Sequence, residues 1–373
     1  MFTDISQELL YPIMPVYLKT IGFSIVLIGI LEGVAEATAG LSKGYFGNWS
    51  DNLGKRLPFV QIGYGLSSIS KPMLAAFTFP FWVFLCRTTD RLGKGIRTGA
   101  RDALLSNETT PEFKGRIFGF HRAMDTLGAA IGPALALVFL LFYPGEYRLL
   151  FLIAFAPGLI ALSITFFIRE VKIVEEKVVK KTGLLDFFSY LKVSSPSYRK
   201  LLFSLLIFAL FNSSDVFLLL KIKDAGFSDT IVIGAYVFYN LVYALFAFPM
   251  GWLADKLGMK TVFVAGLILF SSVYAGMAFA STQIEFLFLF FLYGIFAAST
   301  EGIAKAWLSN LCPPHETATA IGTYTAFQSL CTLVASSAAG LIWYYYSPAT
   351  TFLATAVVVG VVTLFLLGQR REG

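Results

Sequence analysis

The segment Gly47–Arg56, with the sequence GNWSDNLGKR, is a short polar stretch in a very apolar chain. A variant, GWLADKLGMK, stands 204 positions later (251 minus 47) at Gly251–Lys260, with its glycines, its aspartate and a base at the same spacing. A second motif repeats at an offset of 203, in which Asn107, Pro111 and Gly119 correspond to Asn310, Pro314 and Gly322. We therefore interpret the chain as two copies of one structural plan.

The composition places this chain in a lipid bilayer. Hydrophobic residues make up 57% of its 373 residues and charged residues only 14%, whereas soluble domains have about a quarter charged. One helical span needs about 20 apolar residues, which leaves room for about twelve spans. No cleavable signal peptide is visible, so the first span should stay in the protein. Topology explains the net charge of +6 better than nucleic acid does, since basic residues gather in cytoplasmic loops.

Apolar runs between glycine, proline or charged breaks predict twelve helices. Their ranges are 2–18, 24–47, 58–77, 80–105, 117–142, 147–168, 199–221, 230–253, 261–280, 285–309, 318–343 and 349–368. Basic residues cluster in alternate connections, such as Lys55 with Arg56 and Lys256 with Lys260, whereas the connection at 281–285 has none. We therefore expect a multi-pass protein of the bacterial cytoplasmic membrane with both termini in the cytoplasm.

The longest charged segment starts at Arg169, near the middle of the chain. We interpret it as a cytoplasmic linker, residues 169–198, between one six-helix bundle at 1–168 and another at 199–373; a tail that binds a partner is the alternative. The predicted fold class is an all-α membrane protein with two pseudo-symmetric six-helix bundles. Parallel repeats of this kind build one large class of transporters, with the substrate site between the halves.

Four motifs of the sequence resemble those of the major facilitator superfamily, and they occur along the chain in the order that the family has. The two loop copies resemble its signature between the second and third helices, and RLGKG at 91–95 resembles its motif in the fourth helix. The fifth predicted helix resembles the antiporter motif of exporters in the superfamily, although Ala136 and Leu137 stand where glycines would end it. The matching residues are Gly47, Asp51, Gly54, Lys55, Arg56, Gly251, Asp255, Gly258, Lys260, Arg91, Gly95, Gly119, Gly128, Gly132 and Pro133.

This resemblance implies a gating role for the repeated loop, which in the family latches the two halves in the outward-facing state. Physical chemistry supports such a role. An aspartate just after a helix C-terminus, such as Asp51 or Asp255, gains by turning toward a neighbouring helix N-terminus or a base. Gly54 and Gly258 permit the tight turn. The simpler interpretation is a turn with basic anchors.

The predicted helix 80–105 has its charged residues on one face. A charge inside a membrane costs about 3 kcal/mol or more unless it finds a partner or faces a water-filled cavity, so such charges are candidate functional residues. We assign Arg87, Asp90 and Arg91 to substrate binding or coupling for this reason.

Carboxylates on the first two predicted helices are the expected counter-charges. Asp4 and Glu8 are four residues apart, as are Glu32 and Glu36. In the superfamily, helices 1, 4, 7 and 10 line the central cavity, which would place Asp4 and Glu8 opposite the arginines. A carboxylate beside an arginine stays ionised, and it gains affinity for a proton when a substrate takes the arginine. Asp4 or Glu8 is thus a candidate proton carrier; a fixed structural ion pair is the alternative.

His121 and Asp125 are four residues apart and share a stripe with Gly128 and Gly132. Asp125 would fix the tautomer of the histidine, which is either a packing residue or a proton site. Glycines allow a neighbouring helix to approach closely, so we expect this stripe to face the other half of the protein.

The second half is less charged and more aromatic. Its candidates for cavity lining are polar or aromatic side chains: Asn212, Asp215, Tyr236, Tyr239 and Asn240. Packing is the alternative for the tyrosines. Glu301 and Lys305 are four residues apart, and we expect them to pair near the cytoplasmic end in a gating role.

We predict a proton-coupled secondary active transporter of a small organic solute, with the glycine motif favouring export. Its partners would be the solute, protons and the lipid bilayer; we expect a monomer with no nucleic acid, cofactor or bound metal. The alternatives are a proton-coupled importer of a small metabolite or siderophore, and a metal-ion carrier that uses Asp4, Glu8 and His121. An enzyme is disfavoured because the sequence has two histidines and no catalytic motif. The two-fold repeat disfavours a channel.

Overall fold

The computed structural model describes residues 1–11, 13–170 and 188–368, apart from the side chains at a few helix positions, Glu32 among them. These residues form helices, and no strand is found among them. In chain order the α-helices are α1 (Phe2–Glu8), α2 (Met14–Thr20), α3 (Ile25–Leu53), α4 (Leu57–Ala76), α5 (Pro80–Asn107), α6 (Lys114–Phe142), α7 (Tyr147–Thr165), α8 (Tyr190–Val193), α9 (Pro196–Ala209), α10 (Val216–Asp224), α11 (Asp229–Leu257), α12 (Met259–Phe279), α13 (Gln283–Asn310), α14 (Thr317–Tyr345) and α15 (Pro348–Gly368). Short 3₁₀ helices, η1 (Pro111–Phe113) and η3 (Pro314–Glu316), precede α6 and α14.

Each predicted helix range coincides with helical structure, but two of the ranges are interrupted. The range 2–18 divides into α1 and α2, and the range 199–221 divides into α9 and α10. The prediction of one continuous helix is wrong at both places. In the second, a run of asparagine, serine and aspartate side chains at 212–215 competes for backbone hydrogen bonds and favours a loop. Both interruptions fall in the first predicted helix of a half.

Six helical segments of the described part are long and apolar enough to cross a membrane. They are Pro111–Phe142, Tyr147–Thr165, Ile231–Leu257, Met259–Phe279, Gln283–Asn310 and Pro314–Tyr345. α5 is as long as these, with 28 residues, but its charged face lowers its mean hydropathy. The total of twelve spans stays a prediction.

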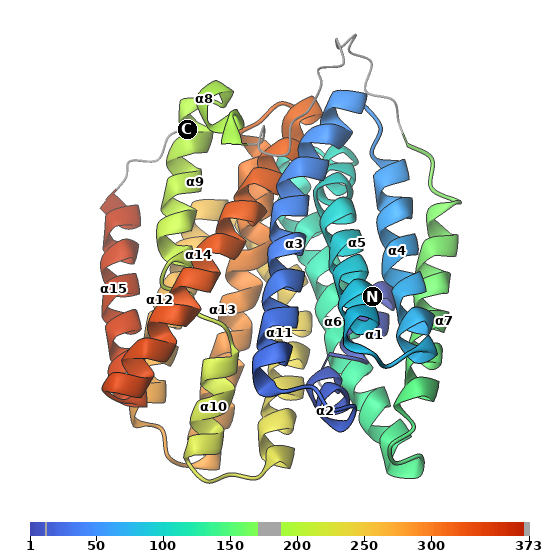
Figure 1. Ribbon diagram of the computed structural model, residues 1–373. Helices are drawn as coiled ribbons and strands as arrows, with labels where there is room; N and C mark the ends of the chain where they lie inside the picture. Colours follow the sequence, from blue (N-terminus) through green and yellow to red (C-terminus); the bar gives the residue numbers. More distant parts are fainter. Residues whose placement is uncertain (12, 171–187, 369–373) are drawn as a thin grey trace. The chain divides into compact units, whose positions relative to one another are not determined.

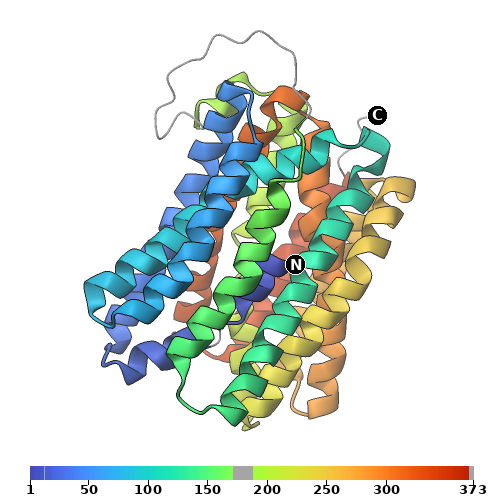
Figure 2. The ribbon, with the colours of Figure 1, turned by 90° about the vertical axis from the view of Figure 1, so that its right-hand side faces the viewer.

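The chain divides into two compact units. Unit 1 comprises Met1–Glu108, Leu127–Ser194 and Cys312–Ser329. Within it, α5 packs along both α3 and α4, and α4 packs against α7 (Figures 1 and 2). One of its buried clusters is apolar and includes Leu18, Val83, Cys86 and Phe151.

Unit 2 comprises Thr109–Thr126, Ser195–Leu311 and Leu330–Gly373. Within it, α13 packs against α11 and α12, and α12 packs against α15 (Figure 1). The core between these helices is aromatic. The Phe270 ring stands 5.4 Å from that of Phe208 at 83° and stacks on Tyr274 at 4.1 Å, and such ring pairs add to the stability gained from burial.

Each unit consists of one half of the chain plus a short segment of the other half. The segment Thr109–Thr126 belongs to unit 2 and Cys312–Ser329 to unit 1, so α6 and α14 each begin in one unit and end in the other. The division into 1–168, 169–198 and 199–373 stays a prediction. Within its linker, residues 171–187 lie outside the described residues.

Candidate functional site

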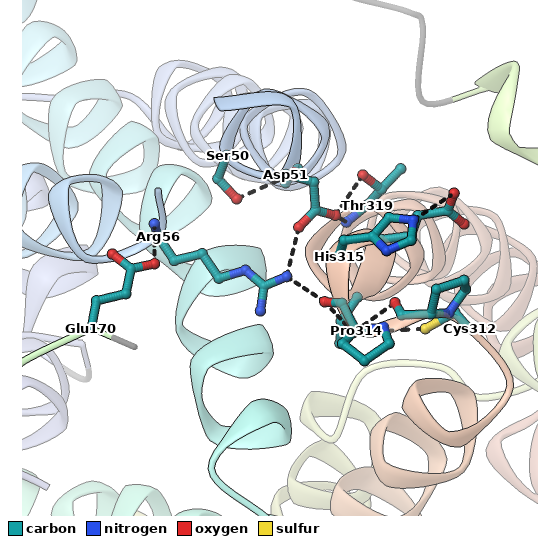
Figure 3. Close-up of polar contacts among 12 residues, drawn as sticks. Ser50, Asp51, Arg56, Glu170, Cys312, Pro314, His315 and Thr319 are labelled. Carbon is teal, nitrogen blue, oxygen red and sulfur yellow. Dashed lines mark hydrogen bonds and ion pairs between the residues drawn. The ribbon is translucent and has the colours of Figure 1, made fainter. Parts of the chain in front are cut away.

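In the first copy of the repeated loop, Asp51 caps the start of α14 (Figure 3). One of its carboxylate oxygens accepts hydrogen bonds from the Thr319 backbone N–H at 2.6 Å and the Thr319 hydroxyl at 2.8 Å. The other lies 3.0 Å from the guanidinium of Arg56, which also donates to the Pro314 carbonyl at 2.6 Å. All four residues belong to unit 1, and Asp51 and Arg56 are buried. The carboxylate thus meets both the positive end of a helix and a base.

In the second copy, Asp255 caps the start of α6 in the same way. Its carboxylate accepts hydrogen bonds from the backbone N–H groups of Gly115 at 2.7 Å and Arg116 at 3.0 Å. The Arg116 side chain donates from Nε at 3.1 Å. These residues lie in unit 2. Here the base comes from the capped helix, whereas Arg56 belongs to the loop itself.

Glycines end both loop helices and allow the turn that follows. Gly54 has a φ of 63° at the end of α3, and Gly258 has a φ of 92° at the end of α11. Both values lie in the region that favours glycine, because a side chain there would clash with the backbone. The two turns lead directly to Lys55 and Arg56 in one copy and to Lys260 in the other.

Glycines within the helices allow close approach to the capped helices. A Cβ atom on Gly47 of α3 would overlap the carbonyl of Ala318 in α14, within unit 1. A Cβ atom on Gly119 of α6 would overlap the carbonyl of Ala247 in α11, and Gly251 of α11 meets Gly115 in the same way, within unit 2. The repeated loop and these glycines therefore form one arrangement, made twice.

Gly128 and Gly132, farther along α6, face a different neighbour. A Cβ atom on Gly128 would come within 2.8 Å of the Asp4 side chain, and one on Gly132 within 2.7 Å of the Leu9 nitrogen. The expectation that this stripe faces the other half is wrong for these two glycines. Their close contacts are with α1 in unit 1, a helix of only seven residues.

The start of the predicted linker contacts the first loop. The Glu170 carboxylate accepts hydrogen bonds from the backbone N–H groups of Arg56 at 2.7 Å and Leu57 at 3.0 Å, and so caps α4 (Figure 3). Farther along, the Tyr190 hydroxyl donates to Glu316 at 3.2 Å. Sequence reasoning missed both contacts, because the charged run at 169–198 gives no signal of which of its residues contacts the bundle.

The charged face of α5 is partly neutralised by α4. The Lys71 ammonium lies 2.6 Å from the Asp90 carboxylate and also donates to the Ser67 carbonyl at 2.6 Å. Arg97 donates to the Ser67 hydroxyl at 2.9 Å. All four are buried. Sequence reasoning assigned Asp90 but missed Lys71, whose signal was a lysine inside an apolar helix.

One predicted counter-charge contacts the arginines of α5. The Arg91 guanidinium lies 3.2 Å from Glu36 of α3; Arg91 is 8% exposed and Glu36 61% exposed. Arg87 is buried one turn away on α5. The side chain of Glu32 lies outside the described part.

The carboxylates of α1 lie near the same bases. Glu8 interacts electrostatically with both Lys94 and Arg91, and Glu36 interacts with the same two side chains. The Asp4 carboxylate lies 2.9 Å from the amino group of Met1. Two carboxylates and two bases thus share one region of unit 1.

The other predicted pair of the first half belongs to unit 2. His121 Nδ1 lies 3.4 Å from the Asp125 carboxylate, and both side chains are mostly buried. Their i, i+4 spacing on α6 brings them together as the helix geometry requires.

In unit 2, Asp215 and the tyrosines form one cluster. Asp215 stands at the interruption before α10 and accepts a hydrogen bond from the Tyr293 hydroxyl at 2.5 Å, with Tyr239 as a second partner. The Tyr239 ring lies 5.1 Å from the Tyr293 ring and 6.4 Å from that of Tyr236. Sequence reasoning missed Tyr293, although it is a tyrosine in an apolar stretch, residues 286–298, of α13.

Two amide side chains stand beside this cluster. Asn240 is buried and donates to the Tyr236 carbonyl at 2.9 Å within α11. The side-chain oxygen of Asn212, in the interruption, is buried and has no hydrogen-bond partner among the described residues.

Glu301 forms an ion pair with Arg122 of α6, at 3.4 Å. It also accepts a hydrogen bond from the Tyr243 hydroxyl at 3.1 Å. The expected pairing of Glu301 with Lys305, four residues along the same helix, stays a prediction.

These observations define the class of protein. The family model described as Major Facilitator Superfamily matches residues 1–238 and 202–373, and the chain belongs to that family. This confirms the predicted family and the all-α fold, and it makes the chain a membrane transporter rather than an enzyme.

Three relatives extend over nearly the whole chain. An uncharacterized MFS-type transporter of Methanocaldococcus jannaschii is 34% identical over 375 residues, covering 97% of this chain and 92% of the relative. The Staphyloferrin B transporter of Staphylococcus aureus is 23% identical over 381 residues, covering 96% and 88%. The multi-drug resistance efflux pump PmrA of Streptococcus pneumoniae is 22% identical over 383 residues, covering 99% and 93%.

Two crystal structures share the fold. The human organic anion transporter MFSD10 (TETRAN) superposes with a TM-score of 0.84 at 14% identity, covering 98% of this chain and 96% of that one. The transporter FucP in the outward conformation superposes with a TM-score of 0.78 at 12% identity, covering 99% and 96%.

Proposed function

We propose that this transporter exports a small organic solute in exchange for protons, by alternating access. The observation that carries the proposal is the reciprocal pair of caps. Asp51 of the first half holds the start of α14, and Asp255 of the second half holds the start of α6. Each cap joins the two halves of the chain where a helix begins, so a movement that separates the halves at that point has to break the cap. Buried contacts that are either made or broken are the usual elements of a two-state transport cycle.

Export is the direction that the sequence and the relatives favour. The glycine and proline motif of α6, from Gly119 to Pro133, resembles that of exporters. A relative named as a multi-drug resistance efflux pump and another named as the Staphyloferrin B transporter support a small organic substrate. The buried Arg87 and Arg91 of α5 suit a solute that has an anionic or zwitterionic group.

Coupling to protons follows from the carboxylates and bases of unit 1. Glu8 and Glu36 are held near Arg91 and Lys94, so the anionic group of a zwitterionic solute that binds these bases displaces the carboxylates. A displaced carboxylate that has lost its counter-charge takes up either a proton or the cationic group of the solute. Proton and solute therefore compete for the same carboxylate, which is the relation that exchange requires. We place the protein in the cytoplasmic membrane with twelve spans and both termini in the cytoplasm, as the positive-inside rule indicates.

Reconstituted transport tests the proposal. Proteoliposomes with an imposed pH gradient would be screened with labelled organic solutes, and we expect accumulation against the solute gradient. Asp4→Asn and Glu8→Gln should abolish this accumulation, because a side chain that stays neutral cannot take up and release a proton, while counterflow without a gradient continues. Solute movement that ignores the pH gradient in the wild-type protein would contradict proton coupling. Unchanged uphill transport in both variants would remove these two residues as carriers.

A further inference from the structure

Asp215 differs from the other buried or mostly buried aspartates whose contacts the structure describes. Asp51, Asp90 and Asp255 each form an ion pair with a base, at 3.0, 2.6 and 3.1 Å. The hydrogen bonds of Asp215 come instead from the hydroxyl groups of Tyr293 and Tyr239. Within the described residues, no base forms an ion pair with Asp215. It is the exception among the aspartates in the interior of this chain.

The groups around Asp215 come from three helices of unit 2. Tyr239 lies on α11, Tyr274 on α12, and Tyr293 and Glu301 on α13. α14 meets the interruption through the Ser336 hydroxyl, which accepts a hydrogen bond from the Ser214 backbone N–H at 3.0 Å. The three tyrosines are between 1% and 5% exposed. Among the described residues, the charged group that acts on Asp215 is a second carboxylate, Glu301, which cannot serve as a counter-charge.

A series of contacts leads from Asp215 to α6. The Tyr239 ring lies 6.2 Å from that of Tyr243, whose hydroxyl donates to Glu301, and Glu301 pairs with Arg122 of α6. All of these residues belong to unit 2. A change of charge at Asp215 therefore reaches Arg122 through one continuous cluster. Arg122 lies on α6, the helix that Asp255 caps.

The chemistry of this cluster suits a group that gains and loses a proton. An ionised carboxylate without a counter-charge is costly among apolar rings, so the neutral acid becomes accessible. Tyrosine hydroxyls can hold both forms, since each can donate to a carboxylate or accept from a carboxylic acid. Because Asp215 is only partly buried, protons from the solvent can reach its carboxylate.

We propose that Asp215 binds a second coupling proton, with Tyr239 and Tyr293 as positioning residues. The inference rests on the proposed proton-coupled transport and adds a site in the second half of the chain to the carboxylates of unit 1. In the step, a hydronium ion gives its proton to the carboxylate, which forms an O–H bond, releases a water molecule and neutralises the side chain. The altered charge then changes the electrostatic interaction between Glu301 and Arg122 through Tyr239 and Tyr243.

Infrared spectroscopy of the purified full-length protein tests the site without a transported solute. A titration from alkaline to acidic pH should produce a band of a protonated carboxyl group. Asp215→Asn should lose this band, whereas Asp224→Asn, which changes an exposed aspartate of the same helix α10, should keep it. Tyr293→Phe should change the midpoint of the band by about one pH unit, or tenfold in proton affinity. A band that persists unchanged in Asp215→Asn would overturn the assignment.

Proteoliposomes then test whether this proton is a coupling proton. With ciprofloxacin, a zwitterionic fluorescent drug, as the probe and a pH-sensitive dye trapped inside, we expect Asp215→Asn to reduce gradient-driven movement at least about tenfold and to retain counterflow. If the wild-type protein is coupled and Asp215→Asn remains coupled, the inference fails while the proposed function stands. If the wild-type protein moves ciprofloxacin without regard to the gradient, the proposed function fails, and so does the coupling role of Asp215.

Discussion

Asp51 and Asp255 each cap the start of a helix, but their basic partners differ. Each carboxylate accepts hydrogen bonds at the first turn of a helix, but the base is Arg56 of the loop in one copy and Arg116 of the capped helix in the other. The expectation that each acid follows the end of its helix is wrong, because Asp51 and Asp255 lie in the last turns of α3 and α11. That each would turn toward a helix N-terminus or a base could still be predicted from its place at a helix C-terminus. The origin of the base could not, because both copies have a base after the second glycine and only packing decides which one reaches.

At Asp51, we expect Asp51→Asn to slow turnover about tenfold while the solute dissociation constant changes less than twofold. The amide keeps one acceptor for Thr319 but loses the charge that holds Arg56, which weakens the capped state by about 1 to 2 kcal/mol. Asp255→Asn is the matched variant and should behave alike. Equilibrium binding and counterflow on the same preparation provide the measurement. Loss of binding in either variant would place the residue in the substrate site instead.

The pair of Lys71 and Asp90 allows a test of stability. Either Lys71→Met or Asp90→Asn alone leaves an uncompensated charge or polar group between α4 and α5. Breaking a buried pair in this way should lower the free energy of unfolding by about 3 kcal/mol. The double variant Lys71→Met with Asp90→Leu removes both charges and should recover most of the loss. Thermal unfolding in detergent measures the three variants. A double variant that is as unstable as either single variant would contradict this expectation. It would mean that the two side chains stabilise the fold by more than the neutralisation of each other's charge.

The helices show where sequence patterns are informative and where they fail. Hydropathy located every long helix to within six residues at each end, because a buried or lipid-facing run needs apolar side chains throughout. It missed the interruption after α9, since a window of about 20 residues averages over the four polar positions at 212–215. It missed the interruption after α1 because the sequence at 9–13 is itself largely apolar. Contacts between helices, such as those of Lys71, Tyr293 and Arg122, depend on rotation and packing, which one sequence does not reveal.

At the scale of helix packing, Gly47→Ala should destabilise the contact between α3 and α14. The added methyl group would overlap the Ala318 carbonyl, and such overpacking costs about 1 to 3 kcal/mol. Gly234→Ala in α11 is the matched control, because nothing lies within 4 Å of the added atom. That change should raise stability by up to about 1 kcal/mol, since alanine favours a helix over glycine. Thermal unfolding compares the two, and equal effects would contradict a packing role for Gly47.

The basic residues predict how the whole molecule is oriented in the membrane, and labelling can test that orientation. In a variant whose native cysteines are replaced, Ser195→Cys before α9 and Ser281→Cys before α13 are both exposed and lie in opposite kinds of connection. A membrane-impermeant maleimide added to intact cells should label Ser281→Cys at least about tenfold faster, because basic connections stay in the cytoplasm. Labelling of inverted vesicles is the control and should reverse the preference. Faster labelling of Ser195→Cys in cells would invert the topology.

The exchange of Thr109–Thr126 and Cys312–Ser329 between the units has a consequence for any attempt to divide the gene. A fragment that stops before Ser195 would retain Asp51 without Thr319, and the remaining fragment would retain Asp255 without Gly115. Each fragment would thus contain a charged carboxylate without the helix N-terminus that it caps in the intact protein. The two pieces made together in one cell should recover one another and regain activity, whereas either made alone should be degraded.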